Sequence, residues 1–400
     1  MKSISTQFTP ETLEAPVRVG RKGKHITIGV PKDLSHLEKR VPLTPSAVSV
    51  LVNNGHHILF ESGAGAESHF YNHEYSEAGA EILNDKKDIY KADIVVKMAP
   101  PSLDDIALMK TEQTLLSPVQ IPTLTVEILQ GMMKKRITAF AFEYIRDESG
   151  SFPIVRSMSE IAGSTAILIA SEYLSHHFHG KGILLGGISG VAPARVIILG
   201  AGTVGEFAAR TALGLGAMVK VFDNSIFKLM RLQNHIGTRV FTSVLDPEVL
   251  LNELKSADVA VGAIHSPSGR APVVVTEQMV AQMKSGSVIV DVSIDQGGCF
   301  ETSEVTTHDK PTFKKYDVIH YAVPNIPSRV SRTASYAVSS ILYPAILDSV
   351  AHGGTDGYLR YALPVRSGVY LYKGVLVNSA IADKFGIKST DLNLLLASER

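Results

Sequence analysis

A glycine-rich turn in the middle of the chain constrains the fold more than any other feature. In the segment ARVIILGAGTVG, the apolar run 196–199 predicts a buried parallel strand, and three glycines with the G-x-G-x-x-G spacing follow it. A helix is predicted to begin near Thr203, and the next strand, AMVKVFD, ends in Asp223. A strand, a glycine turn, a helix and an acidic strand end in this order indicate a dinucleotide-binding site.

The turn is expected to hold the pyrophosphate of the dinucleotide. Its first glycine allows a tight turn, its second lets the backbone approach the phosphates, and its third lets helix and strand pack closely. Exposed N–H groups and the positive end of the helix dipole would attract the phosphates. The predicted cofactor-binding residues of the turn are Gly200, Ala201, Gly202, Thr203, Val204 and Gly205.

Asp223 indicates which dinucleotide binds. It follows Gly200 by 23 residues, near the roughly 20 expected of the acid that binds a ribose 2′-hydroxyl. A 2′-phosphate beside this carboxylate would meet a like-charge repulsion of about 4 kcal/mol per charge pair. The sequence therefore predicts NAD as the cofactor, although the positive charge of Lys228 makes the exclusion of NADP incomplete.

Composition narrows the class of protein. The chain of 400 residues is 45% hydrophobic, enough for two or three domains with large cores. Its 39 basic and 39 acidic residues cancel, so a small-molecule substrate is expected rather than nucleic acid or an anionic membrane. No apolar stretch reaches the length of about 18 residues that predicts a membrane span. The single cysteine, Cys299, rules out an intramolecular disulfide and fits a reducing compartment, so a cytoplasmic location is expected.

Strand and helix patterns predict the domain organisation. Residues 1–24 lack the apolar region of a secretory signal and form a polar arm, either disordered or wrapped around a neighbouring subunit. Long helices are predicted over 156–180 and from about Ser331. We expect an α/β fold with two Rossmann-like domains that have parallel sheets, joined by the two long helices. The NAD-binding domain (156–330) would be inserted in mid-chain, and both flanks (25–155 plus 331–400) would build a discontinuous substrate domain.

Several longer motifs resemble one enzyme superfamily. They are EKRVPLTPSAV (38–48), MSEIAG (158–163), GILLGGISGVAPARVIILGAGTVG (182–205), MKSGSVIVDVSIDQGGCFET (283–302) and HYAVPNIPSRVSRT (320–333). Together they resemble the superfamily of alanine dehydrogenase and the nicotinamide-binding alpha subunit of NAD(P) transhydrogenase, and most closely alanine dehydrogenase. The resemblance implies reversible, NAD-dependent oxidative deamination of L-alanine to pyruvate and ammonia by a homo-oligomer, either a hexamer or a dimer.

The resemblance also implies roles for individual residues. Arg40 would bind the substrate carboxylate, for which a guanidinium is suited because it grips a carboxylate with two hydrogen bonds; an ion pair with Glu38 is the alternative. Asp295 would be the catalytic aspartate that handles protons; a turn-capping role before Gly297 is the alternative. The remaining cofactor contacts would be Ser159, Asn325 and Ile326 at the nicotinamide end and Lys228 near the adenosine ribose.

Two positions depart from the family pattern. Alanine dehydrogenases carry a substrate-contacting lysine in a K-V-K-E-P stretch and an acid–base histidine in an L-H-L stretch. The matching stretch here is KMAPP, in which Lys97 takes the place of the first lysine and Ala99 the place of the second, functional lysine. The stretch that matches L-H-L is PVQIP, in which Gln120 takes the place of the histidine. Glutamine hydrogen-bonds a carbonyl oxygen but does not titrate near neutral pH. We therefore expect Lys97 and Gln120 to line the catalytic pocket in altered roles.

These departures leave two alternatives open. In the first alternative, the chain is a soluble NAD(H)-binding subunit that works with a membrane transhydrogenase partner, because the transhydrogenase subunit also lacks both residues. Alternatively, it is a dehydrogenase of the same fold for another amino or keto acid, with His36 or His265 as a replacement acid. No H-E-x-x-H or C-x-x-C spacing predicts a metal site, and HHFH (176–179) is expected to end a helix instead.

Overall fold

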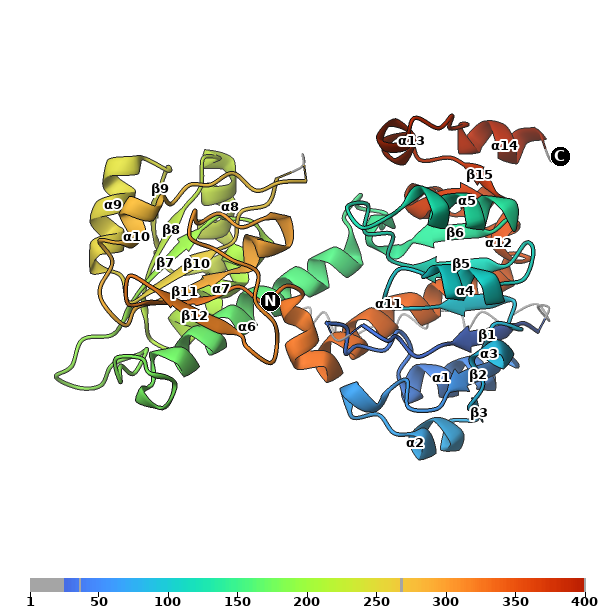
Figure 1. Ribbon diagram of the computed structural model, residues 1–400, viewed down its shortest axis with the longest axis horizontal. Helices are drawn as coiled ribbons and strands as arrows, with labels where there is room; N and C mark the ends of the chain where they lie inside the picture. Colours follow the sequence, from blue (N-terminus) through green and yellow to red (C-terminus); the bar gives the residue numbers. More distant parts are fainter. Residues whose placement is uncertain (1–24, 36, 267–268, 399–400) are drawn as a thin grey trace, which may run out of the picture.

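Two sheets connected by two long helices make up the protein (Figure 1). The computed structural model describes residues 25–35, 37–266 and 269–398. The predicted α/β architecture with two Rossmann-like units is confirmed. The predicted polar arm (1–24) and His36 lie outside the described residues.

The first sheet combines strands from both ends of the described chain. Its eight strands have the order β15-β14-β6-β5-β4-β1-β2-β3. The strands are β1 (Thr27–Val30), β2 (His57–Glu61), β3 (Glu81–Leu83), β4 (Ile94–Val96), β5 (Thr114–Ser117), β6 (Thr138–Ala141), β14 (Val369–Tyr372) and β15 (Val375–Leu376). The helices that accompany them are α1 (Pro45–Asn53), α2 (Asn72–Glu77), α3 (Lys86–Ile89), α4 (Leu103–Leu108), α5 (Val126–Lys134), α12 (Thr355–Tyr361), α13 (Ser379–Phe385) and α14 (Leu392–Ser398).

The second sheet lies in mid-chain and has seven strands in the order β12-β13-β11-β10-β7-β8-β9. The strands are β7 (Arg195–Leu199), β8 (Met218–Phe222), β9 (Phe241–Ser243), β10 (Val259–Gly262), β11 (Val288–Asp291), β12 (Thr312–Lys315) and β13 (Val318–Tyr321). The helices between them are α7 (Thr203–Gly214), α8 (Ile226–Ile236), α9 (Pro247–Ser256) and α10 (Glu277–Val280). The chain runs outward from β7 to β9 and then crosses to β10 on the other side of β7. The end of β7 is therefore the topological switch point at which open α/β sheets bind ligands.

Both sheets are mostly parallel, as predicted, and each also has antiparallel strands at one edge. Strand β14 is antiparallel to β6 and to β15, and β12 is antiparallel to β13. The β12–β13 hairpin turns at Tyr316 and Asp317, which both have a φ of 56°. Antiparallel neighbours need only such a tight turn, whereas parallel neighbours need a crossover helix.

The two long helices are α6 (Pro153–Leu174) and α11 (Ser331–Ala351), and they pack against each other. Helix α6 contributes Ala166 and Ile169 to the core of the second sheet, and α11 contributes Val338 and Leu342 to the core of the first. Helix α6 ends at Leu174 rather than at residue 180, and a short 3₁₀ helix (His176–Phe178) follows. The domain boundaries stay a prediction, since α6 spans the expected boundary after residue 155.

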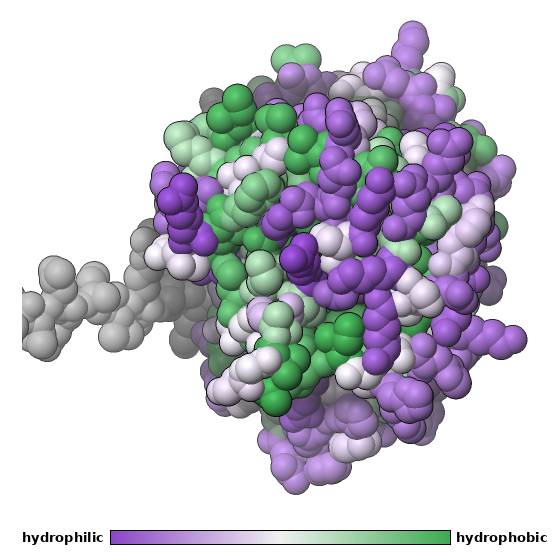
Figure 2. Space-filling view, turned by 90° about the vertical axis from the view of Figure 1, so that its left-hand side faces the viewer, coloured by the Kyte–Doolittle hydropathy of each residue, from purple (hydrophilic) through white to green (hydrophobic). Residues whose placement is uncertain are grey.

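The surface at the end that carries the second sheet mixes hydrophilic side chains with smaller hydrophobic patches (Figure 2). Helix α8 adds three exposed apolar side chains, those of Ile226, Phe227 and Met230. Single exposed apolar residues are common on folded proteins. The apolar residues of the strands themselves are buried: every residue of β10 and β11 is inaccessible to solvent or nearly so.

Close approach of α6 to α7 depends on Gly163. A Cβ at this position would overlap the carbonyl oxygen of Val204 and lie 2.9 Å from the backbone nitrogen of Ala208. Both atoms belong to the helix that follows the glycine turn, so this contact fixes the turn against α6.

We expect Gly163→Ala to lower the free energy of unfolding by about 1–3 kcal/mol, because backbone has to move to admit the methyl group. Gly214→Ala is the matched control, since a Cβ there meets no atom within 4 Å and alanine favours the helix. Chemical denaturation measures both values. Equal stability of the two variants would contradict the packing argument.

Candidate active site

The carboxyl ends of neighbouring parallel strands bring the predicted substrate residues to one edge of the first sheet. Strands β1, β4, β5 and β6 are adjacent and parallel. Arg40 follows β1, Ala99 follows β4 and Gln120 follows β5. The geometry of parallel sheets therefore places these segments along the same edge.

The glycine turn has the conformation predicted for a phosphate-binding loop. Gly200 has a φ of 112°, and a Cβ on it would overlap the carbonyl oxygen of Ala263 on the neighbouring strand end. A Cβ on Gly205 would overlap the carbonyl oxygen of Gly200, so the start of α7 lies directly against the turn. A Cβ on Gly202 would meet nothing within 4 Å. The first and third glycines are thus required by the protein itself, whereas the second leaves open space beside the backbone.

Asp223 lies beside this turn at the end of β8. Its carboxylate accepts hydrogen bonds from the backbone N–H of Ala201 at 2.8 Å and of Ser225 at 2.7 Å. The residue is buried. Lys228 is exposed in the first turn of α8, whose N-cap is Ser225. The structure therefore fixes the acid next to the glycine turn, while the lysine extends into solvent.

Arg40 forms a buried ion pair with Glu38. Its Nε and Nη2 atoms donate to the two carboxylate oxygens at 2.7 and 2.6 Å, and both side chains are at most 10% exposed. The third guanidinium nitrogen, Nη1, donates to the sulfur of Met158 at 3.1 Å. Met158 precedes Ser159 on α6, so the arginine reaches the helix that carries a predicted nicotinamide contact. The ion pair considered from the sequence is present, and the substrate role of Arg40 stays a prediction.

Asn325 connects Asp295 to the Arg40 segment. Its backbone N–H donates to the carboxylate of Asp295 at 3.0 Å. Its side-chain amide donates to the carbonyl of Leu37 at 3.0 Å and to Glu38 at 3.2 Å. Residue 325 follows β13 in the second sheet, and the Leu37 segment follows β1 in the first. One residue thus spans the two halves of the candidate site.

The environment of Asp295 suits a group that exchanges protons. It lies in the 3₁₀ helix η4 (Val292–Gln296) after β11 and remains accessible to solvent. Desolvation by the surrounding protein raises its pKa, and the charge of Asp291 adds to this effect. The Asn325 N–H and the charge of Arg40 act in the opposite direction without cancelling it. Ile326, buried, begins the 3₁₀ helix η5 (Ile326–Val330), and Ser159 is half-buried on α6.

Comparisons with known proteins decide the family. Residues 29–162 match the model "Alanine dehydrogenase/PNT, N-terminal domain", and residues 166–379 match "Alanine dehydrogenase/PNT, C-terminal domain". The chain belongs to the alanine dehydrogenase/PNT family. The predicted resemblance is therefore confirmed.

Relatives and solved structures cover nearly the whole chain. Alanine dehydrogenase of Bacillus subtilis (strain 168) is 38% identical over 93% of this chain and 98% of its own length. Alanine dehydrogenase of Mycolicibacterium smegmatis is 35% identical over 92% of this chain and 100% of its own length. A solved L-alanine dehydrogenase has a TM-score of 0.84 at 35% identity and covers 90% of this chain and 99% of that one. A transhydrogenase from Sinorhizobium meliloti, with a TM-score of 0.75 at 23% identity over 88% of this chain and 99% of that one, shares the fold.

Lys97 lies in a buried network of ion pairs in the first sheet's half of the protein. Its ammonium group lies 2.6 Å from Asp105 and 3.2 Å from Asp33, and its side chain is 4% exposed. Asp105 also pairs with Lys86 at 2.6 Å. Desolvation tends to raise the pKa of Asp105, but the two lysines outweigh it and lower that pKa. The structure therefore shows Lys97 as a counter-ion of two carboxylates, and its place in the catalytic pocket stays a prediction.

Two carboxylates that were not predicted lie beside Ala99 and Gln120, the positions that depart from the family pattern. Asp33 accepts hydrogen bonds from the backbone N–H groups of Met98 and Ala99 at 2.9 and 3.1 Å. Glu143 accepts one from Gln120 at 3.2 Å. Each follows a buried strand of the first sheet, Asp33 after β1 and Glu143 after β6, and this position directly after a strand is the sequence signal that could have identified them.

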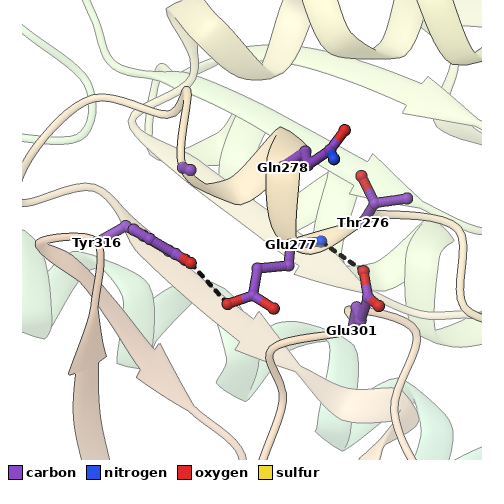
Figure 3. Close-up of a pocket in the computed structure, with 6 residues that line it drawn as sticks. Thr276, Glu277, Gln278, Glu301 and Tyr316 are labelled. Atoms are coloured by element: carbon purple, nitrogen blue, oxygen red, sulfur yellow. Dashed lines mark hydrogen bonds between the residues drawn. The ribbon is translucent and has the colours of Figure 1, made fainter.

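A surface hollow of about 470 Å³ lies elsewhere, near α10 and the β12–β13 turn (Figure 3). Its lining residues are Thr276, Glu277, Gln278, Ala281, Glu301 and Tyr316. Glu277 accepts a hydrogen bond from the Tyr316 hydroxyl at 2.6 Å and donates its backbone N–H to Glu301 at 2.7 Å. The hollow includes none of the predicted site residues.

The described residues hold neither a membrane-spanning helix nor a cluster of metal-binding side chains. Between residues 25 and 398, with residues 36, 267 and 268 left aside, none of the helices combines the length and hydrophobicity of a membrane span. Within the same part of the chain, His, Cys, Asp and Glu side chains do not gather in groups of three that would hold a metal ion. His265 is exposed on the loop after β10.

We expect Lys97→Met to lower the free energy of unfolding by roughly 3–5 kcal/mol, because it leaves two buried carboxylates without their shared cation. Lys91→Met is the matched control: it removes a lysine whose side chain is 71% exposed in a surface pair with Asp88. Urea denaturation followed by circular dichroism measures both. A Lys97→Met protein as stable as the control would contradict the structural role.

Proposed function

We propose that this chain is an NAD-dependent alanine dehydrogenase. It converts L-alanine, NAD⁺ and water into pyruvate, ammonium, NADH and a proton, and the reaction is reversible. The observation that carries this proposal is the likeness to proteins named alanine dehydrogenase, which extends over more than nine-tenths of the chain. The geometry of the glycine turn and the position of Asp295 support it.

The residues of the second sheet fit NAD. The open space beside Gly202 and the N–H groups at the start of α7 suit a pyrophosphate. Asp223, fixed beside the turn, suits the adenosine ribose, and Lys228 lies one helical turn away from it. Ser159, Asn325 and Ile326 would contact the nicotinamide end. When bound, the nicotinamide ring supplies the acceptor for the hydride that leaves the substrate.

Arg40 is proposed to hold the substrate carboxylate. Within the described part of the chain, its Nη1 donates to a thioether alone, which is a weak acceptor, so an incoming carboxylate is a better partner for that nitrogen. Glu38 would keep the guanidinium in place while the substrate binds. Asp295, with its raised pKa, would accept and return the protons that accompany formation and hydrolysis of the imine.

A second candidate rests on Ala99 and Gln120. With these residues in the positions that the resemblance gives to the family lysine and histidine, the family's substrate-contacting lysine and acid–base imidazole would both be missing from those positions. A dehydrogenase of the same fold with another amino or keto acid as substrate, or an NAD(H)-binding subunit that needs a transhydrogenase partner, would account for both changes. We place alanine turnover first because the similarity to alanine dehydrogenases extends over more than nine-tenths of the chain.

We further propose that the enzyme is a homo-oligomer, either a dimer or a hexamer, in the cytoplasm. The solitary Cys299 is fully buried, and burial raises the pKa of its thiol. Such a thiol is inert, which suits a protein of a reducing compartment. Sedimentation velocity of the purified chain distinguishes the two assemblies.

We expect the purified chain to form NADH from L-alanine and NAD, and to consume NADH with pyruvate and ammonium. A screen over amino acids and 2-oxo acids, followed by NADH absorbance, measures the substrate preference.

We expect the double variant Ala99→Lys/Gln120→His to turn over L-alanine at least about tenfold faster, because it restores an acid–base group. Gln282→His, on the exposed surface, is the control. Intact NADH binding without turnover of L-alanine would refute the proposed reaction.

We expect Gly202→Ala to fold like the parent protein and to bind NADH about tenfold or more weakly. The new methyl group meets no protein atom within 4 Å, so a loss of affinity would mean that the methyl group occupies space that the pyrophosphate needs. Gly214→Ala adds a methyl group to equally open space at the far end of α7 and should leave the affinity unchanged. NADH fluorescence titration measures both. Equal affinities would place the pyrophosphate elsewhere.

A further inference from the structure

Glu143 is a buried carboxyl at the sheet edge that carries Gln120. It lies in the 3₁₀ helix η2 (Phe142–Tyr144) after β6, and Gln120 follows β5, the parallel neighbour of β6. One oxygen of Glu143, Oε1, accepts the backbone N–H groups of Val119 at 2.8 Å and of Gln120 at 3.2 Å. Two successive peptide groups of one turn thus depend on a single side chain.

The turn that Glu143 holds has an unfavourable backbone conformation. Gln120 has a φ of 42°, in the left-handed region that residues other than glycine rarely adopt. Its carbonyl oxygen accepts hydrogen bonds from the backbone N–H groups of Thr123 and Leu124 at 2.9 and 3.3 Å. Its side chain is exposed. The hydrogen bonds to Glu143 therefore help to stabilise the unfavourable backbone conformation of Gln120, and this conformation determines the direction of its side chain.

The other oxygen of Glu143, Oε2, is buried and has no hydrogen-bond partner among the described residues. Burial raises the pKa of this carboxyl above its ordinary value of 4.5, although the N–H groups of Val119 and Gln120 act to lower it. The titratable groups that its charge affects are Tyr144 on the same 3₁₀ helix and Tyr370 on β14. No charged side chain of the described residues contributes to the Glu143 shift.

We propose that Glu143 is a positioning residue for Gln120, and that its ionised carboxylate holds the residue-120 turn in the conformation that the reaction needs. The inference rests on the proposed function. A carboxylate makes charge-assisted hydrogen bonds to the two N–H groups, roughly twice as strong as those of a neutral acid. Protonation of Glu143 weakens both bonds and releases the strained turn. Gln120 itself does not titrate, but its position thereby depends on the protonation state of Glu143.

The first experiment compares the pH dependence of kcat/KM for L-alanine in the parent protein, Glu143→Gln and the exposed control Glu148→Gln. Glutamine keeps an acceptor for the two N–H groups but stays neutral at every pH. We expect Glu143→Gln to lose about tenfold in kcat/KM at neutral pH, in line with a weakened hydrogen bond to a charged group. The loss should vanish at acidic pH, where Glu143 of the parent is also neutral.

Asp295 is unchanged in these proteins, so the difference between their profiles isolates Glu143. Binding of NADH should not change in Glu143→Gln. A loss of equal size at every pH would show a structural role alone, and a parent-like profile would show no role; either result would overturn the proposal.

The second experiment needs no turnover. The sequence contains no tryptophan, so Tyr144→Trp places a single tryptophan, which can be excited selectively at wavelengths that tyrosine does not absorb, next to Glu143. We expect its emission to show a transition with a midpoint above pH 4.5 that is absent in Tyr144→Trp/Glu143→Gln. A transition that persists in the double variant would refute titration of Glu143 as its cause. Because this signal is independent of the substrate, it still tests the titration of Glu143 if L-alanine proves not to be the substrate.

Discussion

The bridge made by Asn325 is the contact on which the candidate site depends. Its backbone binds Asp295 and its side chain binds Leu37 and Glu38, so one residue joins the loops at the two sheet edges, and the Lys39 N–H bond to Ser328 adds to this link. Asn325 has a φ of 56°, a conformation that asparagine adopts more readily than other non-glycine residues. Because Glu38 in turn holds Arg40, the bridge also sets the separation of the Arg40 guanidinium and the Asp295 carboxyl. That separation is close enough for the arginine to lower the pKa of Asp295.

The two halves of the site differ in how closely they follow the family. The cofactor side keeps the glycine turn and its acid, both fixed by backbone contacts. On the substrate side, Lys97 neutralises two buried carboxylates, and Gln120 is neutral. Arg40 is therefore left as the cation that the predicted substrate residues offer to a carboxylate, while a buried acid, Glu143, stands next to the glutamine.

Local sequence patterns predicted the fold better than they predicted the site. The strand before Gly200 and the long helices follow from apolar periodicity and glycine spacing, which act over a few residues. The antiparallel strand β14 (Val369–Tyr372) was not predicted, because its partner β6 in the first sheet is distant in sequence. The partners of Lys97 were missed for a similar reason: Asp33 lies on another strand end, and nothing local links the two. The pairing of Arg40 with Glu38 was visible as an alternative because only one residue separates them.

Four carboxyls at strand ends show how the environment separates residues of one chemical type. Burial raises the pKa values of Asp33, Glu143, Asp291 and Asp295. Asp33 has Lys97 beside it. Asp291 accepts three backbone N–H groups and one hydroxyl, so its lone pairs are committed to the loop after β11. Glu143 accepts two N–H groups on one oxygen. Asp295 accepts one N–H and remains open to solvent. A carboxyl with few fixed donors and access to solvent exchanges its proton with the least disturbance of the fold, and this supports the proposal that Asp295, rather than the other three, handles the protons of the reaction.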